Sequence, residues 1–115
     1  MIYRGEIYYA DLSPTVGSEQ GGLRPVVILQ NDVGNKYSPT TIVAVFTTKK
    51  TKSKIPTHYW VNSEKCGLPK NSMVLLEQVR TIDKSRIKTR LGQVPKEDLI
   101  EIEKCLAVSL GLTKI

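Results

Sequence analysis

The sequence predicts a mainly β protein, in which a small, strongly curved antiparallel sheet or partly open barrel is followed by a C-terminal α-helix. Three observations support this fold class. Short segments rich in β-branched, aromatic and aliphatic residues fill the first two thirds of the chain. Clusters of Gly, Pro, Asn, Asp and Ser separate them at close spacing, as between paired strands. The last segment changes to a helical period.

In the first half of the chain, three segments are expected to form strands. Turn residues, Asp11-Leu-Ser-Pro14, end the first of them. The second and third are apolar runs, which predict strands buried on both faces. Between these two, Gln30–Thr41 is rich in turn residues, and Asn31 or Asp32 can begin one short helical turn. The three strands are Glu6–Asp11, Pro25–Leu29 and Thr41–Thr47.

The pattern continues with strands in the second half. His58–Val61 alternates well enough for a strand. A longer strand is expected to begin at Ser72, to bend near Glu77 and to continue through Arg80–Asp83. The other expected elements are a loop over Glu64–Asn71, a helical turn over Asp83–Arg86 and a short closing strand over Ile87–Leu91.

The segment Lys96–Leu110 is predicted to be an amphipathic helix. Apolar residues recur at helical spacing, and charged residues occupy the other faces. Pro95 suits its first turn, and Gly111 suits its C-terminal cap. We expect this helix to cover the sheet rather than to carry the function.

Length and composition predict one domain over residues 1–115. A chain of 115 residues can bury one core and is too short for a second. No apolar run approaches the roughly 20 residues that span a membrane, so no membrane contact is expected. Charges near the N-terminus replace the apolar region of a signal peptide, which predicts a cytoplasmic protein. Cys66 and Cys105 should then stay reduced.

The stretch Gly17–Pro25, Gly-Ser-Glu-Gln-Gly-Gly-Leu-Arg-Pro, is typical of a binding loop that runs into a strand. Gly21 and Gly22 have no Cβ, so the backbone can approach a ligand closely. Arg24 lies where the loop meets the strand, and its planar guanidinium suits the capture of phosphate or carboxylate. The alternative is a surface hairpin loop with a solvated arginine.

The charge of the chain favours a polyanionic partner. The net charge is +6 and the pI is near 9.4. Four lysines cluster in a loop directly after an apolar strand, which we call the lysine loop: Lys49, Lys50, Lys52 and Lys54. A solvated loop tip would explain this cluster equally well.

The inventory of reactive residues excludes several kinds of enzyme. His58 is the only histidine, so a mechanism that cleaves RNA with two histidines is unavailable. No cluster of His, Cys and carboxylates has metal-binding spacing, and no glycine-rich phosphate loop with Lys-Ser or Lys-Thr, as nucleoside triphosphate binding would need, occurs. We therefore expect no metal and no cofactor, and a structural role for His58.

Four parts of the chain together resemble the MazF/PemK toxins of bacterial toxin–antitoxin pairs. They follow in the order expected for that family, and the Gly-Ser-Glu-Gln-Gly-Gly-x-Arg-Pro motif is specific. They are Tyr3–Leu12, Gly17–Val27, Gln30–Asp32 with Ser38–Thr40, and Leu76–Asp83. The resemblance implies a CcdB/PemK-like, SH3-like barrel that forms a homodimer. It also implies a sequence-specific endoribonuclease that cuts single-stranded RNA, chiefly messenger RNA, without a metal.

The resemblance also implies that Arg24 and Thr47 carry out the chemistry. Attack of a 2′-hydroxyl on the adjacent phosphate requires deprotonation of that hydroxyl, stabilisation of the phosphorane and protonation of the leaving oxygen. Arg24 can stabilise the phosphorane, and Thr47 can orient the 2′-hydroxyl or relay its proton. Which residue acts as acid and which as base stays open. A structural threonine at the end of a strand is the alternative for Thr47.

Other residues are expected to hold the RNA, with the base edges read by the glycine-rich loop and the backbone tracked by the lysine loop. Besides the four lysines, they are Ser18, Glu19, Gln20, Gly21, Gly22, Gln78 and Thr81. The expected partner is a MazE-type antitoxin whose flexible acidic segment blocks the groove. The alternative function is a non-enzymatic, protein-binding toxin that resembles gyrase poisons and uses the terminal helix.

Overall fold

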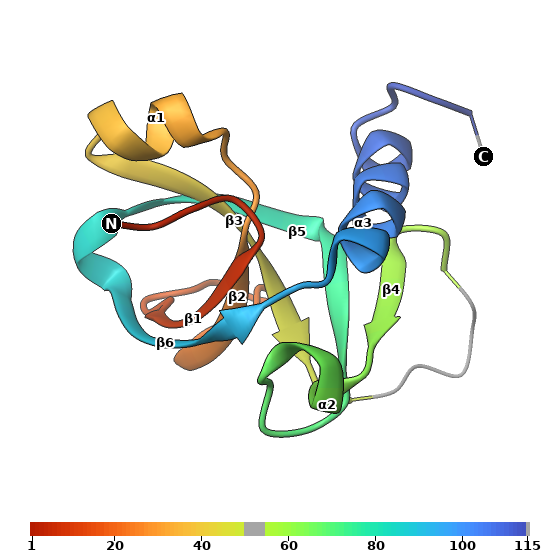
Figure 1. Cartoon of the computed structure of the whole chain (residues 1–115), viewed down its shortest axis with the longest axis horizontal. Coiled ribbons are helices and arrows are strands. Elements are labelled where there is room, and N and C mark those ends of the chain that lie inside the picture. Colours follow the sequence, from red (N-terminus) through yellow and green to blue (C-terminus); the bar gives the residue numbers. More distant parts are fainter. Residues whose placement is uncertain (50–54, 115) are drawn as a thin grey trace.

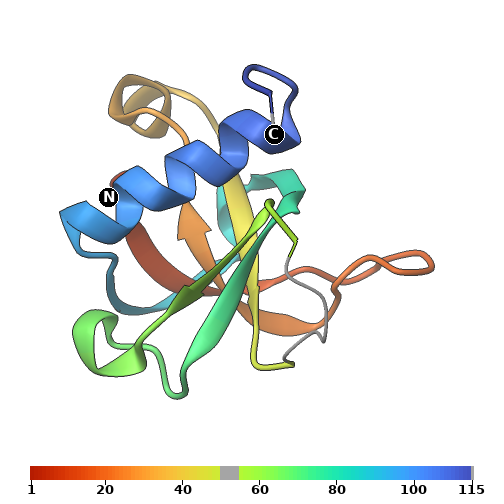
Figure 2. The same cartoon turned by 90° about the vertical axis from the view of Figure 1, so that its right-hand side faces the viewer.

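The computed structural model of the chain describes residues 1–49 and 55–114. In this part of the chain six strands form one sheet, in the order β4-β5-β3-β2-β1-β6, and every neighbouring pair is antiparallel. The sheet curves strongly, and the last helix, α3, lies across it (Figures 1 and 2). The prediction of a mainly β fold with a terminal helix is confirmed.

The strands and helices follow the predicted order. The strands are β1 (Glu6–Asp11), β2 (Leu23–Ile28), β3 (Thr40–Thr47), β4 (His58–Val61), β5 (Ser72–Asp83) and β6 (Ile87–Gln93). The helices are α1 (Asp32–Tyr37), α2 (Ser63–Cys66), α3 (Lys96–Ser109) and the 3-10 turn η1 (Lys84–Arg86). None of these helices is long and apolar enough to cross a membrane.

Two predictions differ from the structure. The loop expected over Glu64–Asn71 begins inside a short helix, α2. The side chain of Asn62 caps this helix by accepting a hydrogen bond from Glu64 N at 2.9 Å, and Gly67 ends it in the left-handed conformation. Strand β2 begins at Leu23 rather than at Pro25, so Arg24 belongs to a strand and not to the loop before it.

Alternating side chains of the central strands fill two apolar clusters, one on each face of the sheet. In β3, Val43 and Val45 belong to one cluster, whereas Ala44 and Phe46 belong to the other. The second cluster includes the fully buried Ile102 of α3. The predictions that β3 is buried on both faces and that α3 covers the sheet are therefore confirmed.

Strand β5 bends where the sequence predicted a bend. Its register against β3 shifts between Ala44, which faces Val79, and Val45, which faces Leu75. The unpaired residues between these positions form a bulge, which lets a strand turn sharply. At the bulge, Glu77 accepts a hydrogen bond from Thr57 Oγ1, and its other oxygen lies 2.6 Å from His58 Nε2. The bulge thus anchors the start of β4.

Contacts outside the sheet hold α3 and α2 in place. Tyr59 of β4 donates a 2.7 Å hydrogen bond to Asp98 of α3. This bond and burial raise the pKa of Tyr59 to about 12. Cys66 and Cys105 are free thiols, and burial raises the pKa of each. The helix α2 packs on β6 through a close backbone contact between Gly67 and Gly92.

The glycine contact predicts a large effect of one methyl group. A Cβ on Gly92 would lie 2.1 Å from the carbonyl oxygen of Cys66. Gly92→Ala should therefore lower the free energy of unfolding by about 1–3 kcal/mol, because the backbones must move apart. Urea denaturation measures this change, and Thr89→Ala, an exposed position in the same strand, is the control. Equal midpoints for the two variants would contradict the packing of α2 on β6.

Candidate active site

The register of two strands brings Arg24 and Thr47 opposite each other. Arg24 is the second residue of β2, and Thr47 is the last residue of β3. The two strands pair with Val26 facing Val45. Because antiparallel partners step in opposite directions, extending this register by two residues places Arg24 across from Thr47. Residues far apart in the sequence are thus neighbours at one end of the sheet.

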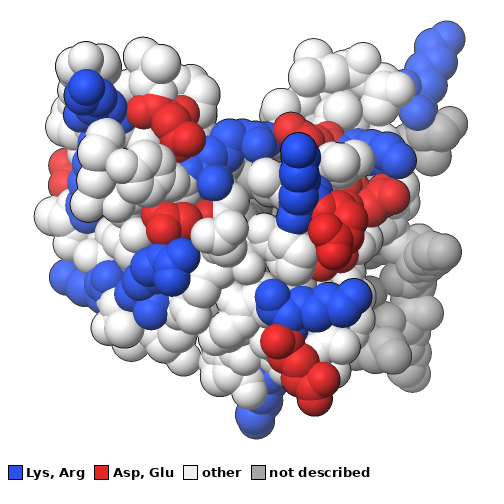
Figure 3. All heavy atoms as spheres, viewed as in Figure 1, with Lys and Arg blue, Asp and Glu red and all other residues white. Residues whose placement is uncertain are grey.

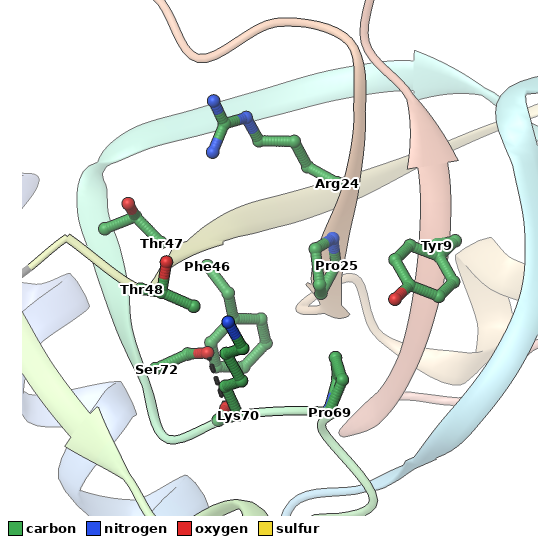
Figure 4. Close-up of a pocket in the computed structure, with 9 residues that line it drawn as sticks. All are labelled: Tyr9, Arg24, Pro25, Phe46, Thr47, Thr48, Pro69, Lys70 and Ser72. Atoms are coloured by element: carbon green, nitrogen blue, oxygen red, sulfur yellow. Dashed lines mark hydrogen bonds between the residues drawn. The ribbon is translucent and has the colours of Figure 1, made fainter.

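Pro25 explains why this end of the sheet is open. Proline has no backbone N–H to donate to a neighbouring strand, and the pairing of β2 with β3 starts only after it, at Val26. The strands are therefore not joined by hydrogen bonds between Arg24 and Thr47. The rings of Pro25 and of the buried Phe46 line the space that opens beside these two residues (Figure 4).

A pocket of about 160 Å³ occupies this opening. Strands β1, β2 and β3 and the connection from α2 to β5 all contribute to its lining. Figure 4 shows the Arg24 guanidinium extending from β2 over one side of the pocket, while the Lys70 side chain enters from the other side. The lining residues are Tyr9, Arg24, Pro25, Phe46, Thr47, Thr48, Pro69, Lys70 and Ser72.

Hydrogen bonds orient both of the central side chains. Arg24 Nε donates to the carbonyl oxygen of Gly21 at 2.9 Å, which leaves the two terminal nitrogens of the guanidinium for a ligand. Thr47 Oγ1 accepts a 3.2 Å hydrogen bond from the backbone N–H of Lys49. The hydroxyl proton of Thr47 can therefore be donated to a bound oxygen. The pair can hold an anion from two sides.

The glycine-rich loop projects from the sheet (Figure 2) and is tied to β5 by one side chain. Gln78 accepts a 3.0 Å hydrogen bond from Gln20 N and donates a 3.1 Å hydrogen bond to the carbonyl oxygen of Ser18. Within the loop, Glu19 accepts a 2.6 Å hydrogen bond from Val16 N. The bend in β5 thus faces the loop, and Gln78 lies beside the residues with which the sequence analysis grouped it.

A second pocket, of about 300 Å³, lies between this loop and the bulge of β5. Its lining includes carboxylates, an amide and a guanidinium. Arg80 donates a 3.1 Å hydrogen bond to the carbonyl oxygen of Leu12, so one terminal nitrogen of this guanidinium already has a hydrogen-bond partner. The lining residues are Ser18, Glu19, Glu77, Gln78, Val79 and Arg80.

Some of the remaining predicted residues lie beside the first pocket, and others do not. Gly21 and Gly22 lead into Arg24, and Lys49 is exposed just after Thr47. Thr81 is exposed on β5 and lines neither pocket. Lys50, Lys52 and Lys54 lie outside the described residues.

His58 takes no part in either pocket. Its side chain is 7% exposed and lies against Glu77. None of the described residues gives its Nδ1 a hydrogen-bond partner. In residues 1–49 and 55–114, no three His, Cys, Asp or Glu residues are grouped so that they could hold a metal ion.

Sequence reasoning missed Lys70. Lys70 lies near the end of the predicted loop Glu64–Asn71. No local sequence pattern shows which loops meet at one end of a sheet. The distribution of charge gives little guidance either. The face in Figure 3 mixes basic and acidic side chains, so no single basic patch marks a site on that face.

Comparison with known proteins identifies the family. The family of PemK-like, MazF-like toxins of type II toxin–antitoxin systems matches residues 3–110. The chain belongs to this family. A toxin of such a system is paired with an antitoxin, so an antitoxin is a partner of this protein. The resemblance seen in the sequence is confirmed.

Solved structures agree with this assignment. An endoribonuclease from a Mycobacterial species, solved in complex with its cognate antitoxin, is 25% identical with a TM-score of 0.82, and 100% of each chain is covered. MazF from Deinococcus radiodurans is 23% identical with a TM-score of 0.82, over 96% of each chain. The toxin MazF-mt6 from Mycobacterium tuberculosis is 21% identical with a TM-score of 0.79, over 95% of this chain and 99% of that one. The last two show the fold alone.

The Gln78 contacts predict how firmly the glycine-rich loop is held. Gln78→Ala removes the acceptor of the Gln20 N–H, and a typical hydrogen bond contributes about 1 kcal/mol. Hydrogen exchange of the Gln20 amide should therefore become about five- to tenfold faster, which NMR can measure. Thr81→Ala, in the same strand but without a contact to the loop, is the control. An unchanged exchange rate in Gln78→Ala would show that the loop is held by other contacts.

Proposed function

We propose that this toxin is a sequence-specific endoribonuclease that cleaves single-stranded RNA, chiefly messenger RNA, in the pocket between Arg24 and Thr47, without a metal ion. The observation that carries this proposal is that a guanidinium and a hydroxyl, from residues opposite each other in register, line one open pocket at the end of β2 and β3. A phosphodiester fits between two such groups, since both can donate to its oxygens. Family membership and the similarity to a Mycobacterial endoribonuclease support the same activity.

The reaction starts with attack of a 2′-hydroxyl oxygen on the adjacent phosphorus. Negative charge then develops on the phosphate oxygens, and the terminal nitrogens of Arg24 stabilise it because the contact with Gly21 uses only Nε. Thr47 holds the 2′-oxygen or a phosphate oxygen in line, since its hydroxyl is fixed by the Lys49 N–H. The products of such an attack are a 2′,3′-cyclic phosphate and a 5′-hydroxyl.

The second pocket supplies the selection of bases. Unpaired nucleotides present free hydrogen-bonding edges, and Ser18 and Glu19 line this pocket with groups that can meet them. Gln78 and Gln20 hold the loop in the shape that does so. Thr81 extends this surface along β5. The backbones of Gly21 and Gly22, together with Lys49, Lys50, Lys52 and Lys54, contact the RNA phosphates.

We further propose a cytoplasmic homodimer whose antitoxin blocks the groove with a flexible acidic segment. Carboxylates that mimic phosphates would suit Arg24 and the lysine loop. Large apolar side chains are exposed near the N-terminus and α1, among them Met1, Val33 and Tyr37. Such a patch supports burial against a second copy of the chain.

Cleavage should require Arg24 and should not require a metal ion. In excess EDTA, the protein should cut single-stranded RNA and leave duplex RNA nearly intact, because paired bases hide their edges. Arg24→Ala should lower the single-turnover rate by about 10²–10³, as loss of one oxyanion donor does. Lys88→Ala, which removes one exposed charge outside both pockets, is the control. Loss of cutting in EDTA that Mg²⁺ restores, or an Arg24→Ala variant of full activity, would contradict the proposed site.

The antitoxin and RNA should exclude each other. An antitoxin peptide and an uncleavable RNA analogue should each raise the apparent Kd of the other, without reaching a plateau at saturation. Fluorescence anisotropy with either partner labelled measures this competition. A ternary complex with both ligands bound at full affinity would place the antitoxin away from the groove.

A further inference from the structure

The pocket beside Arg24 and Thr47 contains a second cationic side chain, which has no role in the reaction steps assigned to Arg24 and Thr47. Lys70 lies in the connection from α2 to β5, and its side chain enters the pocket from the side opposite Arg24 (Figure 4). The pocket therefore has a positive charge on both sides. A single phosphate that binds between them would meet both cations.

The backbone that carries Lys70 is fixed on both sides. The Lys70 carbonyl oxygen accepts a 2.8 Å hydrogen bond from Ser72 Oγ, and Ser72 is only 2% exposed. Asn71 Oδ1 accepts hydrogen bonds from the backbone nitrogen and the hydroxyl of Ser63, at 2.8 and 2.9 Å. Pro69 restricts the backbone on the other side. The flexible side chain thus starts from a rigid position at the edge of the pocket.

The ammonium group of Lys70 is uncommitted. None of the described residues accepts a hydrogen bond from it or forms an ion pair with it. Some other lysines differ in this respect, because Lys84 and Lys88 donate to backbone carbonyls and Lys104 lies 3.5 Å from a carboxylate oxygen of Glu101. Lys70 is free to bind an oxygen of a ligand in the pocket.

Cleavage of RNA needs a group that protonates the leaving 5′-oxygen. A guanidinium holds its proton too tightly in proteins for this task, whereas an alkylammonium has an ordinary pKa of about 10.4. Among the other donors of the lining, Ser72 already donates its proton to the Lys70 carbonyl. Tyr9 lies on the far side of Pro25 from the guanidinium (Figure 4). The remaining hydroxyls, on Thr47 and Thr48, are much weaker acids than an ammonium.

Resting on the proposed endoribonuclease function, we propose that Lys70 is the general acid of the reaction, which contacts the scissile phosphodiester opposite Arg24 and gives a proton to the 5′-oxygen. The 2′-oxygen forms a bond to phosphorus as its own proton passes to water held near Thr47. The bond from phosphorus to the 5′-oxygen breaks, and its electron pair takes the proton from Lys70. The neutral amine then regains a proton from water.

A substrate with a sulfur leaving group tests this role directly. A thiolate leaves without being protonated, so a general acid becomes unnecessary when the 5′-oxygen of the scissile linkage is replaced by sulfur. Cleavage sites are first mapped by sequencing RNA ends produced by the wild-type protein. Two oligonucleotides are then made that differ only in oxygen or sulfur at that bridging position. Wild type, Lys70→Met, Lys70→Arg and Arg24→Ala are compared under single-turnover conditions, with Lys65→Met, an exposed position on α2, as the charge control.

Lys70→Met and Lys70→Arg should cut the oxygen linkage about 10²–10⁴ times more slowly than wild type, as removal of a general acid does. Both should cut the sulfur linkage at close to the wild-type rate, whereas Arg24→Ala should stay slow on both. A Lys70→Met variant that cuts the oxygen linkage normally would overturn the proposal. So would a defect of equal size on both linkages, which would make Lys70 a phosphate-binding charge only.

Two further measurements distinguish an error in the role of Lys70 from misfolding of the variants and from an error in the proposed endoribonuclease function. Thermal denaturation should give both Lys70 variants the wild-type Tm within about 2 °C, since Lys70 is exposed and its ammonium forms no hydrogen bond or ion pair with a described residue. If the wild-type protein cuts neither substrate nor any natural RNA, the proposed endoribonuclease function itself is wrong. If wild type cuts and Lys70→Met cuts equally well, only the role of Lys70 is wrong.

Discussion

The pairing of β2 with β3 is the constraint on which the rest of this structure depends. Its register sets Arg24 across from Thr47, and Pro25 ends the hydrogen bonds between the strands before they reach that pair. A continuous ladder would have closed the space that the pocket occupies. Both strands are buried on both faces, so the register cannot slip without exposing the core. The stability of the sheet therefore also fixes the geometry of the site.

A second set of contacts attaches two loops to this rigid end of the sheet. The bulge in β5 turns Gln78 toward the glycine-rich loop, and the amide of Gln78 holds that loop at two positions. The connection from α2 brings Lys70 to the same pocket because α2 packs on β6 through Gly67 and Gly92. Loops placed by a rigid scaffold are where proteins commonly carry recognition. The proposed cleavage site and the proposed base-reading loop are thus supported by different elements of one sheet.

Sequence reasoning predicted the strands, the bend near Glu77 and the covering helix α3, because each follows from local period or composition. It missed α2, although Asn62 and Gly67 were available as cap signals. It singled out Arg24 from its place after the glycine-rich stretch, but it named Thr47 and paired it with Arg24 only through a family resemblance, since register between distant strands has no local signal. Lys70 was missed for the same physical reason. Its place in the pocket depends on how a loop after α2 meets the ends of β2 and β3.

The claim that this pocket cleaves RNA by attack of the 2′-hydroxyl is tested most directly by removing that hydroxyl at a single nucleotide. An oligonucleotide with one 2′-deoxy sugar on the 5′ side of the mapped cleavage site leaves every base and phosphate unchanged. The account predicts that the protein binds this oligonucleotide with nearly the affinity of the all-RNA substrate and does not cut it at that position. Cutting at an unchanged rate would contradict the account, because a water molecule and not the 2′-oxygen would then be the nucleophile.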